Sequence, residues 1–146
     1  MSQQGVPTRP RGQEDLILLL KEAQNKYGCV PKEAMAKLAD SLDISINEVY
    51  GVASFYSLLS TKPLGKNIIR ICKSLPCYLK HCQIIIESVE KEIGIIPGQT
   101  TTDGRFSFQL INCIGACDKA PAMMVNADVH TDLTPKKISQ ILKTYK

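Results

Sequence analysis

The sequence predicts an α+β protein, in which an N-terminal bundle of three to four helices precedes a βαββα domain. Between residues 13 and 62 the apolar residues recur at intervals of three and four, as they do along one face of a helix. Beyond the turn-rich segment STKPLGK (60–66) come short, isoleucine-rich and alternating stretches that are typical of strands. Because 146 residues can form two small cores, we expect a disordered leader at 1–12, the bundle at 13–62 and the second domain at 63–146.

Three helices account best for the first domain. The first helix is predicted to bury a face made of Leu16, Leu19, Leu20, Ala23 and Tyr27. The second begins near Pro31, because a proline in the first turn lacks only an N–H that would have no partner there. Ser45 and Glu48 form a capping box at the start of the third helix. Its body is predicted to bury Val49, Val52, Phe55, Tyr56 and Leu59, although docking of a partner explains the Phe55/Tyr56 pair equally well.

The second domain is predicted to begin with a buried strand, NIIRIC, that ends at Cys72. A helix then runs from Cys77 to about Ile93. The segment FSFQLIN alternates apolar and polar side chains, as a strand does, and leads to Cys113. PAMMVN is predicted to form a further strand, with NADV as the tip of a hairpin. TPKKISQILKTY closes the chain as a helix with Thr134 as its N-cap.

The composition excludes several classes of protein. The net charge of +4 arises from residues 63–146, which contain eleven lysines and arginines against seven acidic residues. This excess is mild and scattered, without a basic run or interleaved aromatic residues, so we expect no nucleic-acid partner. No apolar run approaches the roughly 20 residues of a membrane span, and the N-terminus has no apolar segment of a secretion signal. We therefore expect a cytoplasmic protein without direct membrane insertion, in which six cysteines favour metal binding or catalysis over disulfides.

One of the five cysteines in the second domain differs from the others. The predicted helix carries an apolar stripe at positions 79, 82, 86, 89 and 93, which must face the sheet. Cys82 belongs to this stripe, and a buried free cysteine behaves as a small hydrophobic residue. We therefore assign Cys82 to the core. By contrast, Cys72 ends a strand and Cys77 begins the helix, which places both thiols at one edge of the sheet.

The four remaining thiols are candidate metal ligands. Cys113 and Cys117 follow a strand, with Gly115 in the turn between them. If the two strands are neighbours, these thiols meet Cys72 and Cys77, and four thiolates select zinc or an iron–sulfur cluster. Zinc ribbons usually use C-x₂-C knuckles, whereas the gaps here contain four and three residues, and wider loops suit a centre with two metal atoms. The spacing favours [2Fe–2S] and leaves zinc and a regulatory or structural thiol pair open.

These residues resemble a known family, the thioredoxin-like [2Fe–2S] ferredoxin subunit of NADH-oxidising complexes. The family includes the 24 kDa subunit of respiratory complex I and the small subunits of NAD-linked hydrogenases and formate dehydrogenases. The resemblance runs from about Leu16 to Tyr145 and is most specific in EVYGVASFYSLLSTKPLGK, ICKSLPC, TTDGRFSFQLINCIGACDKAPAMMVN and LTPKKISQIL. It implies a thioredoxin-like fold for the second domain and cluster ligands at Cys72, Cys77, Cys113 and Cys117. The chain departs from the family at His81-Cys82, where a small pair is usual, and at Cys29.

The resemblance also implies a role and partners. The chain would carry single electrons on a [2Fe–2S] cluster and exchange them with a flavoprotein subunit that binds FMN and NAD(H), alongside further iron–sulfur, hydrogenase or dehydrogenase subunits. The sequence contains neither a G-x-G-x-x-G motif nor a Walker loop, so we expect no catalytic residues for hydride transfer in it. An NADH dehydrogenase and an NAD(P)-reducing or electron-bifurcating hydrogenase fit equally. The alternatives are the small subunit of an NAD-linked formate dehydrogenase and a zinc-stabilised, non-redox interaction module.

Overall fold

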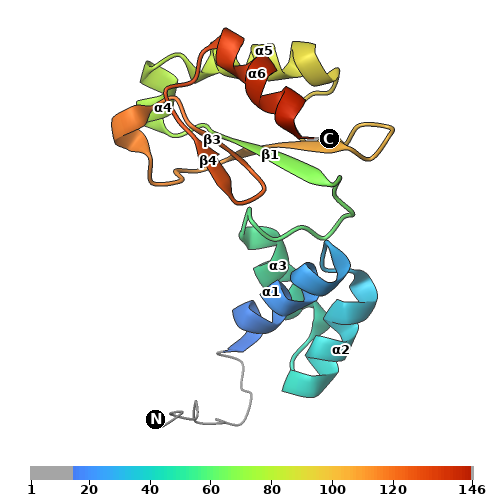
Figure 1. The fold of residues 1–146 in the computed structure, drawn as a ribbon. Coiled ribbons are helices and arrows are strands. Elements are labelled where there is room, and N and C mark those ends of the chain that lie inside the picture. The colour runs from blue at the N-terminus through green and yellow to red at the C-terminus, as the bar shows by residue number, and fades with distance from the viewer. Residues whose placement is uncertain (1–14, 146) are drawn as a thin grey trace, which may run out of the picture. The chain divides into compact units, whose positions relative to one another are not determined.

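The computed structural model describes residues 15–145 (Figure 1). The chain divides into two compact units, Met1–Pro63 and Leu64–Lys146. The leader expected at residues 1–12 lies outside the described residues. Among the helices of residues 15–145, none is both long enough and apolar enough to cross a membrane.

The first unit is helical in its described part. It contains α1 (Leu16–Tyr27), α2 (Lys32–Leu42) and α3 (Ile46–Phe55). The predicted capping box is confirmed, because the N–H of Glu48 donates to Ser45 Oγ (3.2 Å) and the N–H of Ser45 donates to Glu48 Oε2 (2.9 Å). The three helices enclose a core of Leu16, Leu19, Leu20, Val30, Met35, Ala39, Leu42, Val49, Ala53 and Leu59.

Three aromatic residues that the apolar pattern assigned to this core lie at the surface instead. Tyr27, Phe55 and Tyr56 expose 52%, 79% and 41% of their area. All three lie where a helix ends, because Gly28 leaves α1 with a left-handed backbone and Phe55 is the last residue of α3. Core packing is therefore the wrong interpretation of these side chains, and Phe55 packs edge-to-face on Tyr56 (centroid distance 5.1 Å).

The second unit combines helices with one four-stranded sheet. Its elements are β1 (Asn67–Cys72), α4 (Leu75–Leu79), α5 (Cys82–Ile93), β2 (Phe106–Ile111), a short 3₁₀ turn (Cys117–Lys119), β3 (Met123–Val125), β4 (Asp128–His130) and α6 (Pro135–Thr144). The α+β class is confirmed. The predicted order βαββα lacked one strand, because the hairpin after β3 returns as β4. The sheet has the strand order β2-β1-β3-β4.

Strand β1 is central, and its neighbours run in opposite directions. It pairs in parallel with β2, from Asn67 opposite Phe106 to Cys72 opposite Ile111, and antiparallel with β3. Helices α5 and α6 lie together over one face of the sheet (Figure 1). The core between these layers includes Ile69, Ile71, Ile85, Val89, Phe108, Met123, Val125, Ile138 and Leu142.

The helix predicted from Cys77 to Ile93 is interrupted. His81 has a left-handed backbone (φ 61°) that separates α4 from α5. Because the interruption changes the direction of the helix, Leu79 is 66% exposed, whereas Cys82, Ile85, Ile86 and Val89 are buried. The predicted stripe is therefore wrong for Leu79 and right for Cys82.

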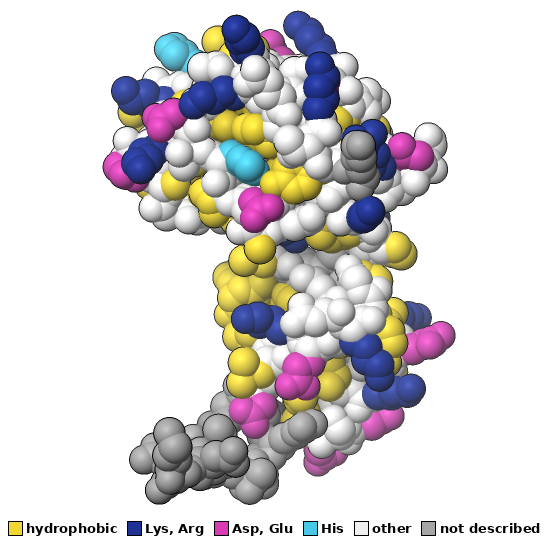
Figure 2. All heavy atoms as spheres, in the orientation of Figure 1, with side chains coloured by type: hydrophobic (Ala, Val, Ile, Leu, Met, Phe, Trp, Pro, Cys, Tyr) yellow, Lys and Arg dark blue, Asp and Glu magenta, His cyan; other side chains and the backbone are white. Residues whose placement is uncertain are grey.

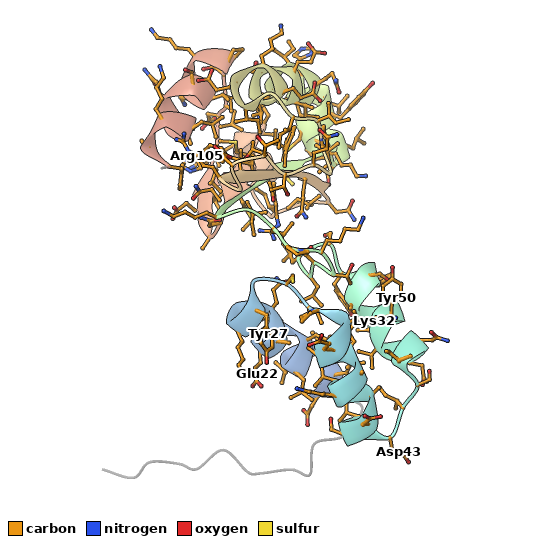
Figure 3. All side chains as sticks on the ribbon, turned by 90° about the vertical axis from the view of Figure 1, so that its right-hand side faces the viewer. Glu22, Tyr27, Lys32, Asp43, Tyr50 and Arg105 are labelled. Carbon is orange, nitrogen blue, oxygen red and sulfur yellow. The ribbon has the colours of Figure 1, made fainter. Side chains whose placement is uncertain are left out.

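Polar contacts fasten the end of the chain to the sheet. Arg105, labelled in Figure 3, donates from Nε to the carbonyl oxygen of Tyr145 (3.2 Å). The Tyr145 hydroxyl donates to Asp128 Oδ2 (2.9 Å) and lies 3.0 Å from His130 Nε2, both on β4. Helix α6 begins at the predicted N-cap, since the N–H of Lys137 donates to Thr134 Oγ1 (3.3 Å). These contacts connect α6 to both edges of the sheet.

Gly65 permits a close approach at the start of the parallel pairing. Its N–H donates to Ser107 Oγ (2.7 Å). A Cβ atom at this position would lie 2.8 Å from the carbonyl oxygen of Gly104 and 2.9 Å from the carbonyl carbon of Phe106. Both neighbours are backbone atoms, so the two chain segments would have to move apart to admit a side chain.

We expect Gly65→Ala to lower the free energy of unfolding by about 1–3 kcal/mol, as other overpacked positions do. Urea unfolding followed by circular dichroism measures this change. Gly51→Ala is the matched control, because a Cβ at Gly51 in α3 meets no atom within 4 Å and alanine raises helix stability by up to about 1 kcal/mol. Equal unfolding midpoints for the two variants would contradict the close approach at Gly65.

Candidate metal centre

The parallel pairing places the two cysteine-bearing loops at one edge of the sheet. Cys72 is the last residue of β1 and lies opposite Ile111, the last residue of β2. Cys113 follows two residues after the end of β2. Parallel strands end at the same edge, so the loop that carries Cys77 and the loop that carries Cys113 and Cys117 leave the sheet side by side.

Cys72 and Cys77 form a buried pair, each with 1% of its area exposed. Burial raises the pKa of Cys77 to about 11, and its thiol donates a hydrogen bond to the sulfur of Cys72. Burial alone would also raise the pKa of Cys72. Hydrogen bonds from the Ser74 backbone, the Cys77 thiol and the Ile114 backbone oppose burial, and the pKa of Cys72 is lowered. Cys72 is therefore the sulfur on which the hydrogen-bond donors of the site converge.

Cys113 and Cys117 form a second, exposed pair. Their sulfur atoms lie 3.2 Å apart, and the N–H of Gly115 donates to Cys113 Sγ (3.3 Å). Gly115 has φ +86°, a conformation that glycine adopts without strain. The hydrogen bond to Cys113 is the largest cause of a raised pKa at Cys117. The glycine lets the loop fold back so that both thiols and one N–H point to the same place.

Backbone groups of the second loop and of the segment before β3 lie near the buried pair. The Ile114 backbone contributes to the lowered pKa of Cys72, and the Ala122 backbone opposes the raised pKa of Cys77. The carbonyl of Ala122 accepts from the N–H of Cys72 (3.2 Å). The charge of Cys72 also contributes to the raised pKa of Cys117. The two cysteine pairs thus lie on neighbouring loops at one edge of the sheet, and their assignment as four ligands of one centre stays a prediction.

The donor set fits a two-iron centre. Four thiolates are the ligands that a [2Fe–2S] cluster takes, and they equally suit one zinc ion. In this structure the thiols form two pairs, and within residues 15–145 no three histidine, cysteine or acidic side chains form a group arranged to hold a metal ion. Backbone N–H groups directed at Cys72, Cys77 and Cys113 suit charged ligands of this kind.

The other two cysteines lie in the cores. Cys82 is 3% exposed and packs in the same apolar cluster as Cys72 and Cys77. Its pKa is raised, first by burial and then by the charge of Cys72. Cys29 is 6% exposed in the first unit. The assignment of Cys82 to core packing agrees with this position, although the side chain lies closer to the proposed ligands than the apolar stripe indicated.

Sequence reasoning missed a charged residue beside this site. Arg70 lies two residues before Cys72 in β1 and is 6% exposed. The signal was present, because Arg70 is the one charged residue in the isoleucine-rich segment NIIRIC. Lysine side chains near the ligands, such as Lys73 and Lys119, are exposed. On the face of the second unit drawn in Figure 2, lysine and arginine side chains are spread out, with acidic side chains between them.

A comparison with protein families matches the chain over residues 3–146 to the thioredoxin-like [2Fe–2S] ferredoxin family. Among curated proteins, the chain is 44% identical over 130 residues to a subunit of the NADH-quinone oxidoreductase of Escherichia coli strain K12, and the match covers 89% of this chain and 78% of the relative. It is 36% identical over 136 residues to the protein of the same name from Aquifex aeolicus, covering 93% and 85%.

Among solved structures, an NAD⁺-reducing [NiFe]-hydrogenase in the air-oxidised state shares the fold, with a TM-score of 0.77 at 22% identity. The match covers 90% of this chain and 22% of the hydrogenase chain. The arrangement of helices and sheet described above therefore recurs as one part of a longer protein.

In protein freed of metal, we expect iodoacetamide to modify Cys113 and Cys117 first. These two thiols are exposed, whereas Cys29, Cys72, Cys77 and Cys82 are buried and react only when the structure opens. Mass spectrometry of peptides from a time course measures the order. Modification of Cys72 or Cys77 as fast as that of Cys113 would contradict the division into an exposed and a buried pair.

Proposed function

We propose that this chain, which belongs to the thioredoxin-like [2Fe–2S] ferredoxin family, is the iron–sulfur subunit of an NADH-oxidising complex of the quinone-reductase type. The observation that supports the proposal is the parallel pairing of β1 with β2, which starts both cysteine-bearing loops at one edge of the sheet. Cys72, Cys77, Cys113 and Cys117 are the proposed ligands. A bound [2Fe–2S] cluster supplies one-electron transfer.

Different parts of the chain hold the two cysteine pairs. Strand β1 and the core fix Cys72 and Cys77, while the turn at Gly115 directs Cys113 and Cys117 toward them. Backbone N–H groups stabilise the thiolate form of the ligands, because hydrogen bonds to an ionised acceptor are stronger than those between neutral groups. Thiolates are the form that binds metal.

Hydride chemistry is assigned to a partner. The sequence has neither of the glycine-rich nucleotide motifs, so FMN and NAD(H) are proposed to lie on a flavoprotein subunit that shares electrons with this chain. The curated relatives are subunits named for an NADH-quinone oxidoreductase. Their identity of 36–44% supports that type of complex over a hydrogenase, because the chain is only 22% identical to the solved hydrogenase structure.

Six free cysteines suit the reducing cytoplasm.

Two measurements on the purified full-length chain test the cluster. We expect a visible absorption spectrum that dithionite bleaches, with iron and acid-labile sulfide in equal amounts. A colourless protein that contains one zinc ion would instead favour a structural, non-redox module. Isolation of the native assembly tests the complex, because a flavin-containing NADH-oxidising subunit should copurify.

Cysteine variants test the ligand assignment. We expect Cys77→Ser and Cys113→Ser to abolish the wild-type cluster spectrum, because each removes one thiolate ligand, whereas Cys82→Ser leaves the spectrum largely intact. Absorption and electron paramagnetic resonance of the reduced proteins measure this. Loss of the cluster from the Cys82 variant alone would show that one of the four assigned ligands is wrong.

A further inference from the structure

Arg70 is a buried cation in the central strand of the sheet. Its side chain is 6% exposed. In the register of the sheet it lies between Gln109 of β2 and Met124 of β3. The residues on either side of it in the strand, Ile69 and Ile71, are fully buried and belong to the apolar core. A charge in this position is exceptional, because arginine is almost never fully buried without a charged partner.

No neutralising partner accompanies Arg70 within residues 15–145. None of the ion pairs or side-chain hydrogen bonds found there involves its guanidinium group, and Nε has no acceptor. The adjacent Gln109 Oε1 is also buried without a donor. Desolvation lowers the pKa of Arg70, but a guanidinium remains protonated in proteins. Among the guanidinium nitrogens, Nε alone is both buried and without an acceptor, so the charge of Arg70 has no acidic partner in the described residues although its terminal nitrogens are not enclosed.

This charge lies next to the proposed ligands. Residues two apart in a strand share a face of the sheet, so Arg70 lies on the same face as Cys72. A rise of about 3.3 Å per residue places their Cα atoms roughly 6–7 Å apart. Lys73, which follows Cys72 in the sequence, is exposed, and water and salt screen exposed charges. Asp118, which follows Cys117, is also exposed.

We propose that Arg70 is a fixed, buried cation whose charge favours the reduced state of the iron–sulfur centre. The inference depends on the proposed function, since it requires that centre to be bound by the four cysteines. Reduction adds one electron, taken from an external one-electron donor, and no proton need be bound. The centre then carries one more negative charge, which the guanidinium group attracts more strongly than the charge of the oxidised state. Because the side chain is largely buried, water screens this attraction less than it screens that of an exposed charge.

Removal of the charge should lower the reduction potential. In the full-length, cluster-loaded chain we expect Arg70→Met and Arg70→Gln to reduce the equilibrium constant for one-electron reduction about tenfold, which equals about 59 mV. A unit charge on the order of 10 Å away at an effective dielectric constant of about 20 has an effect of this size. Dithionite titration followed by electron paramagnetic resonance measures the potential.

Lys73→Met is the matched control. It removes the same charge one residue from Cys72, but from an exposed position, so we expect a change of less than about threefold. Equal shifts for the Arg70 and Lys73 variants, or an unchanged potential in a cluster-loaded Arg70 variant, would overturn the proposal. If the wild-type chain binds no iron–sulfur cluster, the proposed function fails together with this inference.

A second pair of variants leaves Arg70 in place, in case its removal prevents folding. Met124 lies directly opposite Arg70, and side chains opposite each other in antiparallel strands are in contact. We expect the carboxylate of Met124→Glu to neutralise Arg70, so that the reduction potential is lower than in Met124→Gln. The unfolding temperature should not fall, because the new carboxylate gains a cationic partner. Equal potentials for the two variants, or a glutamate variant that unfolds at a lower temperature, would show that Arg70 is not an available positive charge.

Discussion

The thiol site depends on the parallel pairing of β1 with β2. That pairing ends with Cys72 opposite Ile111, so the two ligand-bearing loops begin side by side. Parallel strands require a long crossover, and here α4 and α5 provide it, which is why Cys77 lies inside the connection. Because side chains alternate along a strand, a shift of the register by one residue would turn Cys72 to the opposite face. The backbone contact at Gly65 is positioned at the start of the same pairing.

The two cysteine pairs are held in different ways. Cys72 and Cys77 are buried in the core that also stabilises the fold. Because these side chains are already fixed, binding of a metal group would cost little further conformational entropy there. Cys113 and Cys117 are exposed on a loop, and fixing that loop costs conformational entropy. The N–H of Gly115, which donates to Cys113 Sγ (3.3 Å), reduces this cost because it holds the turn of the loop in place beforehand. Preorganisation of this kind raises affinity without further contacts.

Sequence patterns predicted where the two cysteine pairs lie, because their positions follow from local rules. Each cysteine pair begins at or just after the end of a strand, and Gly115 marks the turn between Cys113 and Cys117. The exposure of Leu79 could not be predicted, because the interruption at His81 is a left-handed residue that is not glycine. Periodicity also overestimated the core at the ends of α1 and α3, since it cannot tell where a neighbouring helix stops. Strand β4 was missed because residues 126–129 were assigned to the tip of the hairpin, whereas Asp128 and Val129 already pair with β3.

Arg70 shows why a departure from a local pattern is informative. An apolar residue or a paired charge would be the ordinary choice at a position that is only 6% exposed, since burial of an unpaired charge costs free energy. Departures of this kind are expected where a site requires them. Four thiolates beside an apolar core form a negative charge in surroundings that disfavour it, and the burial of Cys77 already raises its pKa to about 11. A cation two residues before Cys72 in the same strand offsets that disadvantage and gains from the same low dielectric. The cost of burying Arg70 and the cost of gathering four thiolates are therefore each reduced by the presence of the other.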